Sequence, residues 1–256
     1  MNAVRNYQRE LDQIIEKIGA EEKGAPTLFL HSCCAPCSSY VLEYLRKYFR
    51  ITVFYYNPNI TEDAEYRKRV AEQKRLIAAY NEKLTKTVKI DWDEDMGDGL
   101  RSAHVADGRS DCESEPHKIE IVEGDYEPKR FFKMAEGMER CPEGGERCFA
   151  CYELRLRETA VRAKEGKFDY FTTTLSISPL KNAAKLNEIG ERLAMEYGTV
   201  WLPSDFKKRE GYKRSVELSG EYGLYRQDYC GCVYSRAERE RQKRNIRTDT
   251  SKKREL

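Results

Sequence analysis

A short apolar strand that runs directly into a cysteine-rich turn is the feature that most limits how this chain folds. Residues 27–32 (TLFLHS) form the apolar run, residues 33–37 (CCAPC) form the turn, and residues 38–49 carry apolar side chains at helical spacing. A strand, a turn and a helix in this order are the first half of a unit that sets parallel strands side by side. The cysteines are then expected at the carboxyl end of the first strand.

The same alternation continues along the chain. A second strand is expected at 51–56 and a third at 87–92, with a helix from 61 to about 80 between them. Alternating strands and helices are typical of a parallel sheet with right-handed crossovers, so we predict an α/β fold with helices flanking a parallel sheet. Further on, the periodicity predicts helices at 128–138, 148–164 and 181–197 and strands at 168–175 and 199–202.

The length of 256 residues is within the reach of a single domain. We predict a catalytic α/β domain over 27–235, preceded by a helical extension over 1–26. Between 93 and 116 the periodicity breaks into Gly, Ser and acidic residues, which indicates a surface insertion. Residues 236–256 carry nine basic and four acidic side chains, so this basic tail either contacts phosphates or is a solvated extension.

The whole chain is nearly neutral, because it contains 46 Lys and Arg residues and 44 Asp and Glu residues. Its net charge therefore does not indicate a particular class of binding partner. The charged start, 1–16, lacks the apolar core of a signal peptide. No apolar run reaches the roughly 18 residues of a membrane helix. We expect a cytoplasmic protein, in which nine cysteines favour metal or redox chemistry over a disulfide framework.

Seven of the nine cysteines fall into three clusters. The CxxC spacing lets two sulfurs reach one metal centre, and two such contributions complete a four-thiolate site. Zinc and iron both suit that site. A structural zinc ion normally takes four ligands, however, so the presence of seven clustered cysteines favours a redox centre. The clusters are Cys33, Cys34 and Cys37, then Cys148 and Cys151, and finally Cys230 and Cys232.

The last pair admits two roles. As a redox couple, Cys230 and Cys232 form a small strained ring when oxidised, so their disulfide is comparatively easy to reduce. As ligands, the same two sulfurs hold a second metal together with Cys37. We favour the redox couple.

Polar residues follow several predicted strands, at the edge where parallel sheets bind ligands. Asn57 and Asn59 follow the second strand, and Thr173, Thr174 and Ser176 follow a later one. Together with the cysteine turn they predict one shared crevice, in which Asn57 and Asn59 are candidate substrate contacts.

Five stretches of the sequence together resemble the epoxyqueuosine reductases of the QueH type. The resemblance covers most of the chain from Leu28 to Ser235 and leaves out the insertion and the tail. The stretches are HSCCAPCS (31–38), NPNI (57–60), RCFACYELRL (147–156), FTTTLSISPLKN (171–182) and DFKKREGYKRSVELSGEYGLYRQDYCGCVYS (205–235).

The resemblance implies a two-electron removal of the epoxide oxygen of epoxyqueuosine in the anticodon loop of tRNA, which is the last step of queuosine synthesis. It implies an external electron donor, no cobalamin, and the nucleotide-binding-like α/β layer of ATP-dependent tRNA-modifying enzymes. It also implies a redox-active pair, Cys230 and Cys232, and a [4Fe-4S] cluster held by Cys33, Cys34, Cys148 and Cys151.

Opening an epoxide places negative charge on the departing oxygen, which a Lewis-acidic iron or a proton donor stabilises. Asp228 and Tyr229 directly precede Cys230 and are candidate donors, as is His31. Arg226 is a candidate substrate contact. Basic residues near the motif loops are candidates for phosphate contacts: Lys181, Lys207, Lys208, Arg209, Lys213 and Arg214.

Two other functions compete with this one. An ATP-dependent tRNA-thiolating enzyme of related fold carries a glycine- and serine-rich phosphate loop after its first strand, where this chain has residues 33–37 (CCAPC). A zinc-stabilised RNA-binding module without catalysis is the second alternative. Iron and sulfide in the purified protein favour the reductase, whereas zinc favours the module.

Overall fold

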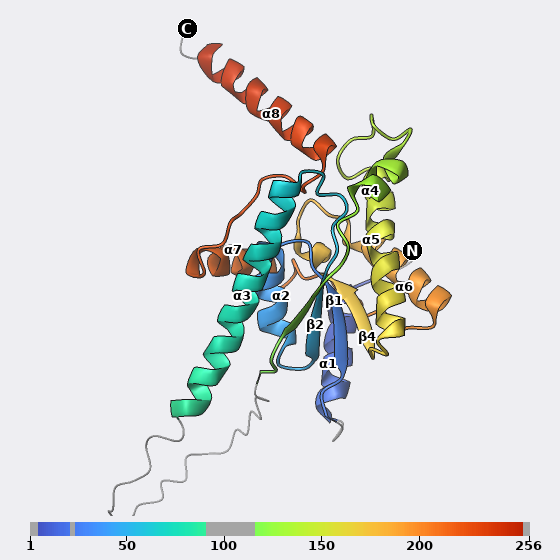
Figure 1. Cartoon of the computed structure of the whole chain (residues 1–256), viewed down its shortest axis with the longest axis vertical. Coiled ribbons are helices and arrows are strands. Elements are labelled where there is room, and N and C mark those ends of the chain that lie inside the picture. Colours follow the sequence, from blue (N-terminus) through green and yellow to red (C-terminus); the bar gives the residue numbers. More distant parts are fainter. Residues whose placement is uncertain (1–4, 21–23, 91–115, 253–256) are drawn as a thin grey trace, which may run out of the picture.

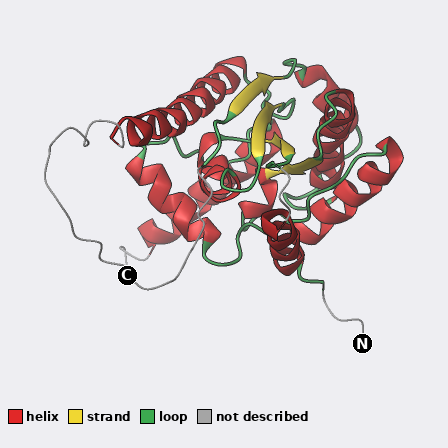
Figure 2. Cartoon of the chain, turned by 90° about the horizontal axis from the view of Figure 1, so that it is seen from below, coloured by secondary structure: helices red, strands yellow, loops and turns green. Residues whose placement is uncertain are grey.

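A four-stranded parallel sheet forms the centre of the protein in the computed structural model, which describes residues 5–20, 24–90 and 116–252. The strand order is β3-β2-β1-β4, so the first strand lies in the middle of the sheet. Figure 2 shows helices on both sides of these strands, which confirms the predicted α/β fold. The strands are β1 (Thr27–His31), β2 (Arg50–Tyr55), β3 (Glu120–Glu123) and β4 (Tyr170–Thr173).

Two groups of helices cover the sheet. In Figure 1, α5 and α6 lie beside β4, whereas α2, α3 and α7 lie on the opposite side. The helix α8 projects away from the rest of the protein. The helices are α1 (Tyr7–Ala20), α2 (Ala35–Leu45), α3 (Asp63–Ile90), α4 (Pro128–Ala135), α5 (Glu146–Glu165), the 3-10 helix η1 (Thr174–Ile177), α6 (Ala183–Tyr197), α7 (Gly211–Glu221) and α8 (Val233–Lys252).

The central strand β1 supplies side chains to the two largest hydrophobic clusters, because successive residues of a strand point to opposite faces. Leu28 and Leu30 pack with apolar residues of α1, α2 and α3, and Phe29 packs with those of α5 and α6. All three side chains are buried. Burial of each stabilises the fold by about 1.5–3 kcal/mol. The strand that carries the cysteine turn is therefore fixed from both sides.

The third strand differs from its prediction. Residues 87–90 belong to the helix α3, so the strand expected at 87–92 is wrong, and the strand that pairs with β2 is β3 at Glu120–Glu123. Its sequence, EIVE, is short and half charged because it lies at the sheet edge, so it gives a weak pattern. The insertion expected at 93–116 lies outside the described residues except for its last position.

The later helices agree more closely with the pattern. The helices predicted at 148–164 and 181–197 are confirmed as α5 and α6, and α6 ends at Gly198 with a left-handed backbone. The strand expected at 199–202 is reduced to one pairing between Phe171 and Trp201. The tail from 236 is helical as far as Lys252, as part of α8. Within the described residues, no helix has the length and apolarity that a bilayer span requires.

Candidate redox and metal site

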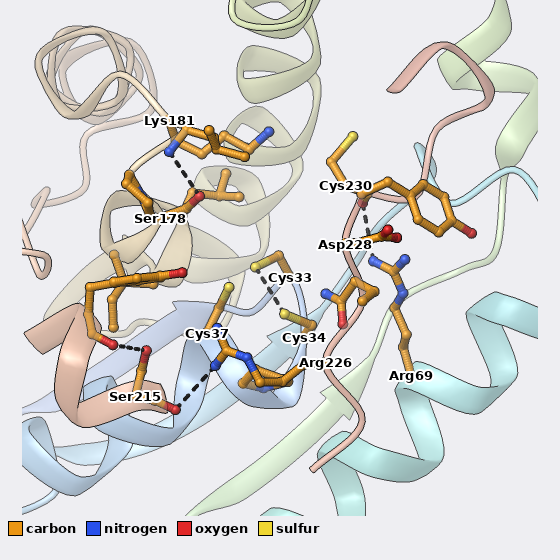
Figure 3. Close-up of a pocket in the computed structure, with 18 of the residues that line it drawn as sticks. Cys33, Cys34, Cys37, Arg69, Ser178, Lys181, Ser215, Arg226, Asp228 and Cys230 are labelled. Carbon is orange, nitrogen blue, oxygen red and sulfur yellow. Dashed lines mark hydrogen bonds between the residues drawn. The ribbon is translucent and has the colours of Figure 1, made fainter. Parts of the chain in front are cut away.

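A cavity of about 390 Å³ lies next to the segments that follow β1 and β4. Cys33, Cys34 and Cys37 line it from the turn between β1 and α2, and Cys230 lines it from the loop before α8. Figure 3 shows these four cysteines around the cavity together with Lys181. A crevice is therefore present at the carboxyl edge of the sheet, and it brings thiols from distant parts of the chain together. The polar residues that were also expected to share it do not line it: Asn57, Asn59, Thr173, Thr174 and Ser176.

The thiols of Cys33, Cys34 and Cys37 form one compact group. Their sulfur atoms all lie within 4.8 Å of one another, and the Sγ atoms of Cys33 and Cys34 are 3.8 Å apart. Four thiolates in a tetrahedron around one metal, at a metal–sulfur distance of ~2.3 Å, stand ~3.8 Å apart. The three sulfurs therefore have the spacing of ligands to a metal ion.

The local environment favours the thiolate form of Cys34, whereas the hydrogen bond with Cys34 raises the pKa of Cys33 and that with Cys33 raises the pKa of Cys37. Cys34 has an extended backbone and immediately precedes α2, and Pro36 occupies the first turn of that helix. The amide dipoles at a helix start stabilise negative charge. Hydrogen bonds from Cys33 and then Cys37 hold the pKa of Cys34 well below its ordinary value.

The second cluster lies at the start of α5. Cys148 and Cys151 are both buried, and the amide of Gly144 donates to the Sγ of Cys148 at 3.3 Å. Cys148 shares a hydrophobic cluster with Cys33, and Cys151 shares another with Cys230 and Cys232. The CxxC pair therefore lies between the other two groups of thiols.

Cys230 and Cys232 face each other across a tight turn, with their Sγ atoms 3.5 Å apart and no bond between them. The residue between them, Gly231, has φ = 112°, and a Cβ there would come within 2.8 Å of Ile60. Only glycine fits this turn without strain. The hydrogen bond from Cys232 is the main cause that holds the pKa of Cys230 well below its ordinary value.

Three buried cations also line the cavity: Arg69, Arg155 and Lys181. Arg69 pairs with Glu65 at 2.7 Å, and Lys181 pairs with Glu143 at 3.4 Å. Within the described residues, Arg155 has no carboxylate in ion-pair range. It donates instead to the oxygens of Cys151 (3.2 Å) and Asn57 (3.4 Å).

A buried cation without a carboxylate is costly unless other negative groups lie close to it. Burial alone would lower the pKa of Arg155, but Cys151, Cys33 and Cys230 raise it overall. The same opposition holds at Lys181, where burial lowers the pKa and Cys230 is the first of the groups that raise it. The cations therefore lie where they would complement negative charge on the cysteine sulfurs, which fits a metal centre with sulfur ligands.

Two buried hydroxyl groups lie near the cysteines, although neither tyrosine lines the cavity. The phenol oxygens of Tyr55 and Tyr152 have no hydrogen-bond partner in the described part of the chain. Burial, and next the neighbouring Cys34, raises the pKa of Tyr55. Tyr152 lies one position after Cys151. Sulfur atoms of a bound centre are acceptors that would satisfy such donors.

Asn57 and Asn59, expected to contact substrate, are both buried. The Nδ2 of Asn57 donates to the oxygen of Ser32 at 2.8 Å, and that of Asn59 donates to the oxygen of Cys230 at 3.2 Å. Neither lines the cavity. The structure thus places them as residues that position the thiol loops.

Three of the basic candidates, Arg226, Lys207 and Lys208, divide in the same way. Arg226 lines the cavity, whereas Lys207 and Lys208 do not. Lys207 pairs with Asp205 at 2.7 Å and donates to the oxygen of Ser176. Only Arg226 among them is placed to meet a ligand in the cavity.

The proton-donor roles suggested for Asp228 and His31 are not supported. Asp228 lines the cavity, but its hydrogen bond with Lys243 lowers its pKa, so the carboxyl group is ionised near neutral pH. His31 is fully buried between Thr173 and Tyr56, and burial lowers its pKa to about 3. At pH 7, Asp228 is therefore a carboxylate without a proton, and His31 is a neutral imidazole rather than an acidic imidazolium.

Arg69 and Arg155 are absent from the sequence-based candidates. Arg155 lies on the apolar stripe of α5, between Tyr152 and Leu156, where a charge is out of place. Such a charge on a buried helix face is the signal that would have identified it.

Clustered thiols, buried cations and a cavity at the carboxyl edge of a parallel sheet are features of an α/β enzyme whose cysteines could hold a metal. The family model described as "Epoxyqueuosine reductase QueH" matches residues 28–96 and 105–238. The chain therefore belongs to the QueH family of epoxyqueuosine reductases, which are oxidoreductases.

Curated relatives agree with this assignment. The chain is 39% identical over 230 residues to the epoxyqueuosine reductase QueH of Streptococcus pyogenes serotype M1, which is 90% of this chain and 78% of that protein. It is 37% identical over 237 residues to the protein of that name from Staphylococcus epidermidis, covering 91% of this chain and 87% of the relative. A third, from Dehalococcoides mccartyi, is 32% identical over 84% of this chain and 95% of its own length.

Proposed function

We propose that this chain reduces epoxyqueuosine in the anticodon loop of tRNA to queuosine, the last step of queuosine synthesis. The relatives carry the name of this activity. The observation that carries the proposal to this chain is the cavity itself, which brings Cys230 and the compact group around Cys34 to one surface.

We assign the ligand role for a [4Fe-4S] cluster to Cys33, Cys34, Cys148 and Cys151. Support comes from the proximity of these cysteines, because Cys33 lies beside Cys34 and shares a hydrophobic cluster with Cys148 of the CxxC pair on the adjacent helix. An iron centre of this kind would supply Lewis acidity and electrons. Cys37 has the same close spacing and is the candidate ligand for an additional iron.

Cys230 and Cys232 act as the redox pair in this proposal. Opening the epoxide to an alkene takes two electrons and two protons and releases the oxygen as water. Oxidation of two thiols to one disulfide supplies the same two electrons and two protons, so the reaction is balanced. The sulfurs need only to close from 3.5 Å to the ~2.05 Å of a disulfide, and an external reductant restores the thiols.

Lys181 stabilises the departing oxygen in this reaction. Its ammonium group is buried, lines the cavity and remains charged because its pKa is raised. A fixed positive charge in a water-poor cavity stabilises a developing alkoxide far better than water does. Since the raised pKa makes Lys181 a poor acid, its role is electrostatic.

We place this chemistry in a catalytic domain over 27–235, with 1–26 and 236–256 as additions, and in the cytoplasm where tRNA is modified. The target nucleoside must leave its stack to enter a cavity of this size, and an unpaired anticodon loop allows that at modest cost.

The direct test is anaerobic incubation of the purified chain with epoxyqueuosine-bearing tRNA and a strong reductant, followed by mass analysis of the nucleosides. We expect loss of the mass of one oxygen from the modified nucleoside. A Cys230→Ser variant is the control for chemistry at the cavity. Unchanged epoxyqueuosine with iron-loaded wild-type protein would falsify the proposal.

A further inference from the structure

The mouth of the cavity carries exposed apolar side chains on two separate elements. Leu180, in the loop between η1 and α6, is 68% exposed, and Tyr212, in the first turn of α7, is 40% exposed. Both line the cavity. Single exposed apolar residues are common on proteins, but two of them at the opening of one cavity indicate a contact surface.

Both residues are presented by well-held backbone. The amide of Leu180 donates to the Oγ of Ser178 at 3.3 Å, and the amide of Lys181 donates to the oxygen of Ser178 at 3.1 Å. Tyr212 follows Gly211, where an added Cβ would lie 2.0 Å from the oxygen of Phe206. The tight fit at Gly211 fixes the start of α7, which carries Tyr212 at the mouth.

A guanidinium group lies at the same mouth without a carboxylate partner. The Nη1 of Arg226 donates to the Oγ of Ser219 at 3.0 Å and to the oxygen of Ser215 at 3.4 Å. Figure 3 shows Arg226 and Ser215 beside the cavity that also holds Cys33. No ion pair involves Arg226 among the described residues. By contrast, Arg214 pairs with Glu43 and Glu221.

We propose that Leu180 and Tyr212 contact the unpaired bases on either side of the nucleoside in the cavity, and that Arg226 binds a phosphate of the same loop. This inference rests on the proposed function. When one nucleoside leaves the stack, its neighbours lose a stacking partner, and an aromatic ring or an apolar side chain replaces it. A positioned guanidinium supplies the complementary charge for the backbone.

The test is the binding of two labelled RNAs to the intact protein, measured by fluorescence anisotropy. One RNA is an anticodon stem–loop with guanosine at the target position, and the other is a fully paired duplex of the same length. Tyr212→Ala and Leu180→Ser should each weaken binding of the stem–loop, by roughly 5- to 100-fold for the ring, and leave duplex binding unchanged. Arg226→Gln should lower the salt slope of stem–loop binding by about one.

Matched controls come from exposed apolar residues away from the cavity. Val216 is one turn after Tyr212 on α7 and 43% exposed, and Met195 on α6 is 79% exposed. Val216→Ala and Met195→Ser should bind both RNAs as the wild type does. Thermal melts establish that every variant is folded.

Wild-type binding of the stem–loop by the two apolar variants would overturn the proposal, and so would an equal loss for loop and duplex. Because binding is measured without turnover, failure of this inference is separate from failure of the proposed function. A chain that discriminates the loop through Tyr212 but leaves epoxyqueuosine intact contradicts only the function. A chain that reduces epoxyqueuosine while both variants bind normally contradicts only the inference.

Discussion

Asn59 donates a hydrogen bond from Nδ2 to the main-chain oxygen of Cys230 at 3.2 Å, although 171 positions separate the two residues. Arg69 donates to the same oxygen, and the amide of Thr61 donates to the oxygen of Gly231. The loop after β2 therefore fixes the backbone of the predicted redox pair.

Replacing Asn59 by Ala should lower the free energy of unfolding by about 1–2 kcal/mol, because a buried acceptor loses one of its donors. The freed loop should also make Cys230 react faster with iodoacetamide. Urea denaturation and timed alkylation measure the two effects. The exposed amide Gln242 serves as the control. Equal stability and equal alkylation rates in Asn59→Ala and wild type would contradict the positioning role.

Arg155→Met should reduce the iron content and shift the midpoint potential of the centre to more negative values. Removal of a nearby positive charge destabilises the reduced state of the centre, which is the more negative one. For a one-electron reduction, a shift of about 60 mV corresponds to a tenfold change in the equilibrium constant. Anaerobic potentiometric titration and iron analysis measure this. Arg157→Met is the matched control, since Arg157 lies on the same helix but pairs with Glu153 at the surface. A potential equal to that of the control argues against a role for Arg155.

Lys181→Met should lower kcat by roughly 100- to 1000-fold with little change in KM for tRNA, because its charge acts on the oxygen that develops in the transition state. Lys181→Arg should restore part of the rate. Lys185→Met is the control, as Lys185 pairs with Glu188 on the exposed side of α6. A kcat within a factor of three of wild type would exclude the electrostatic role.

Cys232→Ser distinguishes the two roles of the last cysteine pair. If Cys230 and Cys232 are a redox couple, the variant keeps its iron but loses turnover with the external donor, and oxidised wild type yields a peptide with a disulfide between them. Loss of iron in Cys232→Ser would instead make the pair ligands. Cys141→Ser is the control because Cys141 does not line the main cavity.

Asp169 links the starts of β1 and β4, since its carboxylate accepts from the amide (2.8 Å) and the hydroxyl (2.7 Å) of Thr27. These bonds lower its pKa below the ordinary 3.8. The folded state thus favours the ionised form, so the stabilisation is full above that value and is lost as pH falls through the lower folded pKa.

Asp169→Ala should therefore lower the free energy of unfolding by about 1–2 kcal/mol at pH 7. The difference in unfolding free energy between the variant and the wild type should become smaller as pH falls below 3.8. Urea denaturation over a pH series measures it. Asp125→Ala is the control, because that side chain is 81% exposed. A difference in unfolding free energy that does not change with pH would show that the charge of the Asp169 carboxylate does not contribute to stability.

The sequence pattern was sufficient for the fold where burial is strong. β1 and β2 are continuous apolar runs because both are covered by helices, so their positions follow from composition. β3 is an edge strand with exposed glutamates, and α3 continues through residues whose β-branched side chains suggest a strand. At β3 the pairing with β2 outweighs the weak local preference.

The site was predictable in its sulfur atoms and less so in its surroundings. Clustered cysteines are rare enough in sequence to be noticed, whereas a buried arginine such as Arg155 is one among many arginines. The spacing also failed to show that Asn57 and Asn59 face the protein interior. That distinction depends on which main-chain oxygens lie opposite them, and these belong to Ser32 and Cys230.

The alternation of Leu28, Phe29 and Leu30 between two cores has a consequence for how such chains diverge. Gain or loss of a single residue inside β1 would exchange the two sets of side chains and turn the following cysteines away from the cavity. The interval between this strand and Cys33 is therefore expected to resist insertions and deletions more strongly than any surface loop does, whatever substitutions accumulate around it.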